Sequence, residues 1–152
     1  MNPYDYEQVQ AVWQRVTGRQ ESEELAAKLP EIIAAEHASA RGYEKMSRQT
    51  GKYGAMFRRM AAEEWQHAKK LATLYELLYN CQPEIAAGVA QETCSFWERV
   101  CRSFRGELGA AEQYHHAAKS WPQHRELFEA LAAEEERHSR NLHRLAQQLR
   151  RS

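Results

Sequence analysis

The chain has 152 residues, enough for one domain with its own core, and its 21 Lys and Arg residues balance its 21 Asp and Glu residues. This zero net charge argues against nucleic acid and anionic membranes as partners, no apolar run approaches the roughly 18 residues that span a bilayer, and the start MNPYDYEQVQ is unlike a signal peptide. Three cysteines without a CxxC pair predict neither a disulfide framework nor a thiolate metal site, so a reducing cytoplasm is the expected location.

Helices dominate the predicted secondary structure. Asp5 is the only Asp and every other acidic residue is Glu, the better helix former, while no segment alternates like a strand. Residues 4–17 predict a short amphipathic helix ended by Gly18, so residues 1–20 form a helix and linker ahead of a domain at 21–152. Pro30 starts or kinks the first helix of that domain. The four helices of the domain are expected at 21–50, 54–80, 92–119 and 123–149.

The segments between these helices carry turn signals. TGKYG at 50–54 is a turn with two glycines. In SWPQ at 120–123, Ser120 is a candidate helix cap, Pro122 suits a first helical turn, and Gln123 stands where a capping box needs it. Residues 81–91 join the second and third helices.

An internal repeat with an offset of 71 residues is the strongest pattern in the sequence. AAEEWQHAKKL at 61–71 is echoed by AAEEERHSRNL at 132–142 without a gap. The repeat predicts two copies of one helical hairpin. The polar and aromatic pairs that it matches are Glu36 with Glu107, Tyr43 with Tyr114, Glu64 with Glu135, and His67 with His138.

Helical spacing places six of these residues on apolar helix faces, where carboxylates without partners would be strongly unfavourable. Two divalent cations would neutralise four Glu, and the i, i+3 spacing lets a Glu and a His reach one ion. Carboxylates and imidazoles without thiolates suit iron or manganese, with zinc as a possible substitute. Bridging and terminal roles stay open. The predicted metal ligands are Glu36, Glu64, His67, Glu107, Glu135 and His138.

Other candidates have weaker claims. Tyr43 and Tyr114 lie on the same inward stripes, and they either pack in the core or hydrogen-bond to ligand carboxylates. Three Glu residues next to the ligands point about 100° away on the helix and are expected in solvent: Glu63, Glu134 and Glu136. The remaining histidines are expected at the surface or rim: His37, His115, His116, His124 and His143.

The paired motifs resemble the rubrerythrin branch of the ferritin-like di-iron carboxylate superfamily over about residues 30–149. The resemblance rests on four motifs: Glu36-x6-Tyr43, Glu64-x-x-His67, Glu107-x6-Tyr114 and Glu135-x-x-His138. It implies an all-α, ferritin-like four-helix bundle, made of two repeated hairpins with a pseudo-twofold axis. It also implies that the connection at 81–91 crosses over along the bundle, which requires a taut connection or a late start of the third helix.

The resemblance further implies two iron ions that reduce hydrogen peroxide or dioxygen. Because the sequence lacks the CxxC pairs of a rubredoxin domain, an external electron donor such as a rubredoxin-like protein is expected. One turn after Glu107, where rubrerythrins usually carry another Glu, stands Ala110, and its repeat mate is Ser39. A ferroxidase that stores or delivers iron is therefore the main alternative. Hydroxylation of an organic substrate and a non-catalytic bundle also stay open, and a homodimer or larger homo-oligomer, with or without helix swapping, is expected.

Overall fold

The computed structural model describes residues 3–88 and 94–151, with only the backbone described for several residues before residue 23. These residues form helices and their connections, and none of them forms a strand. Among them, no helix is long and apolar enough to cross a membrane. The helices are α1 (Pro3–Gln49), α2 (Gly54–Tyr79), α3 (Phe96–Ser120), the 3-10 turn η1 (Pro122–His124) and α4 (Arg125–Arg150).

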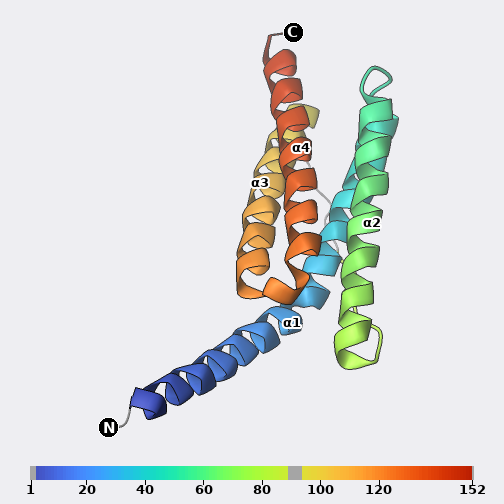
Figure 1. Cartoon of the computed structure of the whole chain (residues 1–152). Helices are drawn as coiled ribbons and strands as arrows, with labels where there is room; N and C mark the ends of the chain where they lie inside the picture. Colours follow the sequence, from blue (N-terminus) through green and yellow to red (C-terminus); the bar gives the residue numbers. More distant parts are fainter. Residues whose placement is uncertain (1–2, 89–93, 152) are drawn as a thin grey trace.

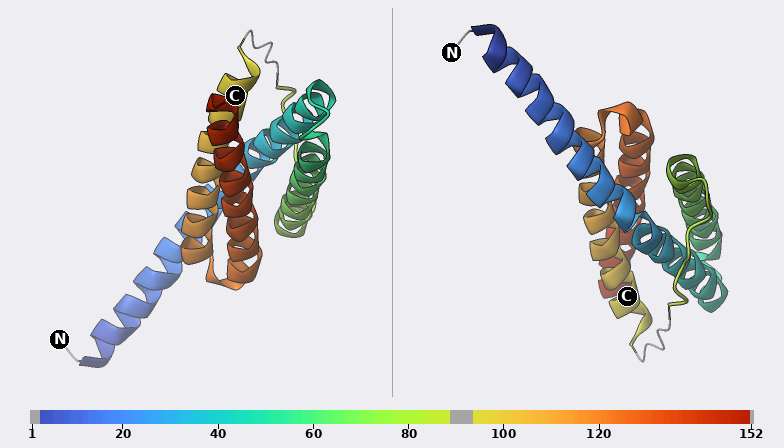
Figure 2. Two further views of the ribbon diagram at one scale, coloured as in Figure 1. Left: turned by 90° about the horizontal axis from the view of Figure 1, so that it is seen from above. Right: turned by 90° about the horizontal axis from the view of Figure 1, so that it is seen from below.

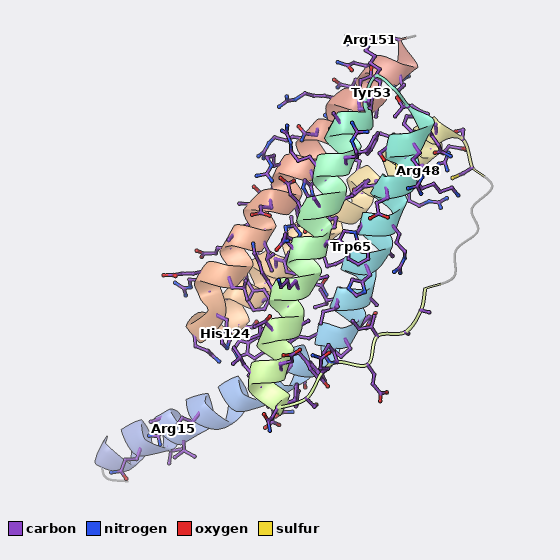
Figure 3. The ribbon with its side chains drawn as sticks, turned by 90° about the vertical axis from the view of Figure 1, so that its right-hand side faces the viewer. Arg15, Arg48, Tyr53, Trp65, His124 and Arg151 are labelled. Atoms are coloured by element: carbon purple, nitrogen blue, oxygen red, sulfur yellow. The ribbon has the colours of Figure 1, made fainter. Side chains whose placement is uncertain are left out.

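The helices form two hairpins side by side, α1 with α2 and α3 with α4 (Figure 1). The short α1–α2 turn requires Gly54, because a Cβ there would lie 2.9 Å from the Ser47 carbonyl oxygen. After α2, the connection runs back along the bundle toward the far end, where α3 begins (Figure 3). The expected all-α bundle with a crossover is therefore confirmed.

The start of α3 is later than the predicted residue 92, in agreement with the short span available to the connection. A capping box holds this start: the Ser95 hydroxyl accepts from the Glu98 N–H, and the Glu98 carboxylate accepts from the Ser95 N–H. Residues 89–93 of the predicted connection and helix lie outside the described part of the chain.

The predicted break at Gly18 is wrong, because α1 continues through it as one helix of 47 residues. A glycine inside a helix costs only about 1 kcal/mol relative to alanine. It ends a helix when it takes a left-handed conformation, and none of the described glycines has a positive φ. Pro30 lies within α1, which changes direction between its N-terminal part and the part in the bundle (Figures 1 and 3). The N-terminal part projects beyond the bundle (Figure 2).

The predicted cap at Ser120 is also wrong. Ser120 is the last residue of α3, and its hydroxyl lies 3.4 Å from His116 Nε2 instead of capping the next helix. The chain turns through Trp121, which is 1% exposed and stacks on Phe128 with ring centroids 6.0 Å apart. Burial of this large ring therefore determines the turn, and Pro122 opens η1 as predicted.

Two apolar clusters fill the bundle, one on each side of its middle. The cluster nearer Trp121 includes Leu29, Ile33, Leu71 and Leu131, and the cluster nearer the α1–α2 turn includes Met46, Phe57, Val100 and Leu142. Along every helix, the predicted metal ligands fall between residues of the two clusters. The apolar packing thus encloses a polar layer from both ends.

Candidate metal centre

The structure brings all six predicted ligands together in the middle of the bundle. Each of the four helices contributes to the layer, and every one of these residues is 5% exposed or less. They fall into two groups, and within each group one ligand atom per residue lies within 4.8 Å of the others. The first group is Glu36, Glu64, His67 and Glu135, and the second is Glu64, Glu107, Glu135 and His138.

Glu64 and Glu135 belong to both groups, whereas each remaining residue belongs to one. This arrangement suits Glu64 and Glu135 to bridging two ions. Glu36 and His67 would then complete one ion site, and Glu107 and His138 the other. The geometry thus favours one of the two assignments that the sequence left open.

The two hairpins interlock at this layer. His67 Nδ1 lies 2.8 Å from Glu135 Oε1 of the opposite hairpin, and His138 Nδ1 lies 2.8 Å from Glu64 Oε1. The contacts within each Glu-x-x-His pair are longer, 3.6 Å from His67 to Glu64 and 3.3 Å from His138 to Glu135. The rings of His67 and His138 stack with centroids 5.9 Å apart. These reciprocal contacts are what a pseudo-twofold axis through the centre requires.

Each tyrosine also reaches across the bundle. The Tyr43 hydroxyl donates to Glu107 Oε1, and the Tyr114 hydroxyl donates to Glu36 Oε1. Burial raises the pKa of both phenols well above the usual value, so they remain donors. The sequence left open whether the tyrosines pack in the core or hydrogen-bond to carboxylates. Both apply, because each ring also packs in an apolar cluster.

The expectation that Glu63 and Glu134 lie in solvent is wrong. His67 Nε2 lies 2.6 Å from Glu134 Oε2, and His138 Nε2 lies 2.7 Å from Glu63 Oε2. Both carboxylates are little more than a quarter exposed. Glu63 and Glu134 point away from the core of their own hairpin. Each of them instead contacts the buried histidine of the opposite hairpin. The repeat carried a signal for this role, since Glu63 matches Glu134 at the same offset as the ligands.

The other polar candidates lie outside the centre. Glu136 is half-exposed and pairs with the exposed His115 at 2.8 Å, so both stand at the surface as expected. His37 is partly buried against the Trp65 ring. None of the three cysteines, which are described at Cys81, Cys94 and Cys101, belongs to either ligand group.

The histidine geometry tests whether a metal fits. When Nε2–H donates to the outer carboxylate, a neutral imidazole presents the lone pair of Nδ1 to the centre. Each Nδ1 lone pair then faces a carboxylate oxygen 2.8 Å away with no proton between the two atoms. Within the described part of the chain, both Nδ1 atoms therefore lack a hydrogen-bond partner, as do Glu64 Oε1 and both Glu135 oxygens. Unpaired buried acceptors that face one another are unfavourable, and a cation between them removes the penalty. The residues therefore fit two divalent ions.

Without metal, protons take over the role of the ions. Burial raises the pKa of Glu36 to about 8 and that of Glu107 well above its usual range. Although burial favours a neutral ring, contacts with Glu135 and Glu64 raise the pKa of His138 to about 11, and the pKa of His67 also rises. With Glu64 and Glu135 ionised, these protonations make the six-residue centre neutral. Two divalent ions would displace about four protons and keep it neutral.

Among the comparisons with known proteins, a family model matches the second hairpin. Neither the curated proteins nor the solved structures give a match to the chain. The family model described as rubrerythrin matches residues 98–152, a segment that contains Glu107, Tyr114, Glu135 and His138. The matched segment and the all-helical bundle are consistent with a rubrerythrin-like domain of the ferritin-like type.

Proposed function

We propose that the chain binds two iron ions between its hairpins and reduces hydrogen peroxide or dioxygen with electrons from a separate donor. The observation that carries this proposal is the pair of ligand groups that share Glu64 and Glu135, with both histidine Nδ1 atoms turned inward and unpaired among the described residues. The rubrerythrin match over residues 98–152 supports the proposal of a di-iron centre.

Six residues would hold the ions in this proposal. Bound iron would supply the electrons and the Lewis acidity for cleavage of an O–O bond. The donors are carboxylates and imidazoles, which suit iron and manganese better than magnesium or copper(I). The ligands would be Glu36, Glu64, His67, Glu107, Glu135 and His138.

The surrounding residues would hold these ligands in place. Tyr43 and Tyr114 donate to Glu107 and Glu36, which fixes the terminal carboxylates and leaves a phenol proton beside each. Glu134 fixes the orientation of His67 through Nε2. The two apolar clusters exclude bulk water from the ends of the layer, and this strengthens every charge interaction within it.

A ferroxidase is the second candidate, and one observation favours it. The position one turn after Glu107 holds Ala110, and the matching position holds Ser39, so neither half of the centre has an additional carboxylate there. The ligand set is the same in both halves, without the extra Glu that the rubrerythrin resemblance leads one to expect. In this version iron is the substrate and leaves the centre after oxidation.

The test begins with metal-free protein loaded with Fe(II) in the absence of oxygen. Iron is counted per chain, and peroxide or air is then added in separate stopped-flow runs. Two irons per chain, oxidised much faster by peroxide, support the peroxidase. Rapid oxidation by dioxygen with uptake of further iron supports the ferroxidase.

Two variants make the test specific. Glu135→Gln removes a shared ligand and should abolish iron binding, while Glu112→Gln changes an exposed residue of α3 and should leave it unchanged. Intact helical protein that binds no iron would contradict the dimetal centre and both functions built on it.

A further inference from the structure

A cavity lies between α1 and α3, beside the proposed metal centre. Its volume is about 550 Å³, within the range of small-molecule sites. Small residues on both helices leave this space open, namely Ala38, Ser39, Gly42, Ser103 and Gly106. Tyr43, which donates to Glu107, also lines the cavity. One side chain thus belongs to both the cavity and the wall of the metal centre.

The lining of this cavity is strongly basic. Four of the lining residues carry a positive charge, and none of the described ones is acidic. The chain as a whole has no net charge, so the excess is local. A concave surface with charge of one sign concentrates ligands of the opposite sign. The basic residues are Arg41, Lys45, Arg99 and Arg102.

The internal repeat shows that the bundle does not need this charge. At the offset of 71 residues, Arg41 corresponds to Glu112, Lys45 to His116, and Arg102 to Glu31. Arg99 alone keeps a basic counterpart, Lys28. The same helix faces therefore carry two acids in the other half of the molecule. The positive charge is specific to one side of a duplicated scaffold.

Arg99 adds an independent sign of a missing ligand. Its Nε atom is buried and has no hydrogen-bond partner in the described chain. A buried donor without a partner destabilises the fold, and a guanidinium donor is matched best by a carboxylate or phosphate oxygen. An oxyanion in the cavity would satisfy this donor.

We propose that the cavity binds a small-molecule oxyanion, with carboxylate or phosphate groups that pair with Arg41, Lys45, Arg99 and Arg102. Planar guanidinium groups match the geometry of such oxygens, and the volume admits an organic anion larger than a single phosphate. This site is separate from the ligands of the proposed metal centre and does not depend on iron.

The test measures binding of inorganic phosphate and of citrate to the full metal-free chain by calorimetry, at low and at moderate salt. Binding of either anion that weakens with salt is expected. Phosphate binding alone would identify a phosphate site, and tighter citrate binding a polycarboxylate site. Absence of binding by both anions would overturn the proposal.

Two variants assign the binding to the cavity. Arg41→Gln with Lys45→Gln changes exposed side chains of α1 and should weaken binding at least about tenfold, with the helical content and melting temperature retained. Arg99→Gln tests the orphaned donor separately. The matched control is Lys69→Gln with Lys70→Gln, which removes two charges from a different cavity on α2. An equal loss in the control, or unchanged binding in both cavity variants, would contradict the site.

Discussion

The two hairpins agree closely at the candidate metal centre and diverge around it. Each supplies one Glu from its first helix and a Glu-x-x-His from its second, and each tyrosine reaches the carboxylate of the other hairpin. Outside this layer the copies differ. Helix α1 begins at Pro3, far ahead of Leu25, the residue that matches the start of α3 at Phe96. The shared centre constrains the inward positions of both copies, while the outward positions are free to acquire separate roles.

The difference extends to the carboxylates that hold the histidines. Arg137 Nη2 lies 3.0 Å from Glu63 Oε1, so Glu63 has both an arginine and His138 as neighbours. The residue that matches Arg137 in the first hairpin is Gln66. The two proposed ion sites therefore have identical candidate ligands and unequal surroundings. Variants at matched positions of the two hairpins can show whether the two proposed ion sites differ in metal affinity.

The largest expected effect comes from the shared carboxylates. Glu64→Gln or Glu135→Gln removes a ligand from both groups, so affinity for both ions should fall more than about 100-fold. Glu36→Gln and Glu107→Gln each remove a ligand from one group, and should leave one ion bound. Metal content per chain after dialysis measures the difference. Equal losses from all four variants would contradict the bridging assignment.

The pH dependence of the metal-free protein should be the next largest effect. The pKa of Glu36 rises from 4.5 to about 8, so the folded state holds this proton more tightly than the unfolded state. The resulting stability is present below pH 4.5 and is lost as the pH rises to about 8, a change on the order of a few kcal/mol. The raised pKa of His138, about 11, acts in the same direction above pH 6.5.

Melting temperatures between pH 5 and pH 9 measure this loss. The temperature should fall with rising pH in metal-free protein, and the stabilisation by added divalent metal should grow, because the ion replaces protons. Glu36→Gln and Glu107→Gln should flatten the slope to similar extents, since the pKa of Glu107 is also raised by burial. A melting temperature that rises over this range would show that the carboxyls are ionised without metal.

The outer carboxylates should have a smaller effect. Glu134→Gln and Glu63→Gln keep the size of the side chain and weaken the acceptor for histidine Nε2–H, so metal affinity should fall about 10- to 100-fold. Glu136→Gln, on a half-exposed residue of α4 that contacts neither histidine of the centre, is the matched control and should change nothing. Titration with a competing chelator measures all three. Wild-type affinity in both Glu63 and Glu134 variants would contradict their role in orienting the ring.

The repeat explains why the centre could be predicted from the sequence. A single polar residue on an apolar helix face is a weak signal of metal binding. Because the repeat places the same polar residues on matching faces of both hairpins, metal binding explains all six of them together. Helical periodicity predicted the helices in the same way, and the resemblance to rubrerythrins implied their arrangement in a bundle with a crossover. The structure places the predicted ligands together and buries them, with His67 and His138 fully buried, and their role as metal ligands stays a prediction.

The errors came from features that depend on packing between elements. The geometry of a single helix predicts Glu63 and Glu134 in solvent, but the neighbouring hairpin brings a histidine against each of them. The Gly18 break and the Ser120 cap relied on local signals that α1 and the buried Trp121 ring override. Local sequence patterns predict which helices form. The packing of the two hairpins against each other decides what residues at the edge of the ligand layer, such as Glu63 and Glu134, contact.

The smallest expected effect distinguishes the two ion sites most directly. Arg137 is about half exposed, so its ion pair with Glu63 contributes about 0–1 kcal/mol. Arg137→Gln makes position 137 identical to its matched position, Gln66, in the first hairpin. The variant should shift the affinity for one ion by a few-fold at most. Stepwise Fe(II) titration should show two unequal steps in the parent chain that converge in the variant. If the steps are already equal in the parent chain, the symmetry of the ligands outweighs the asymmetry of their surroundings.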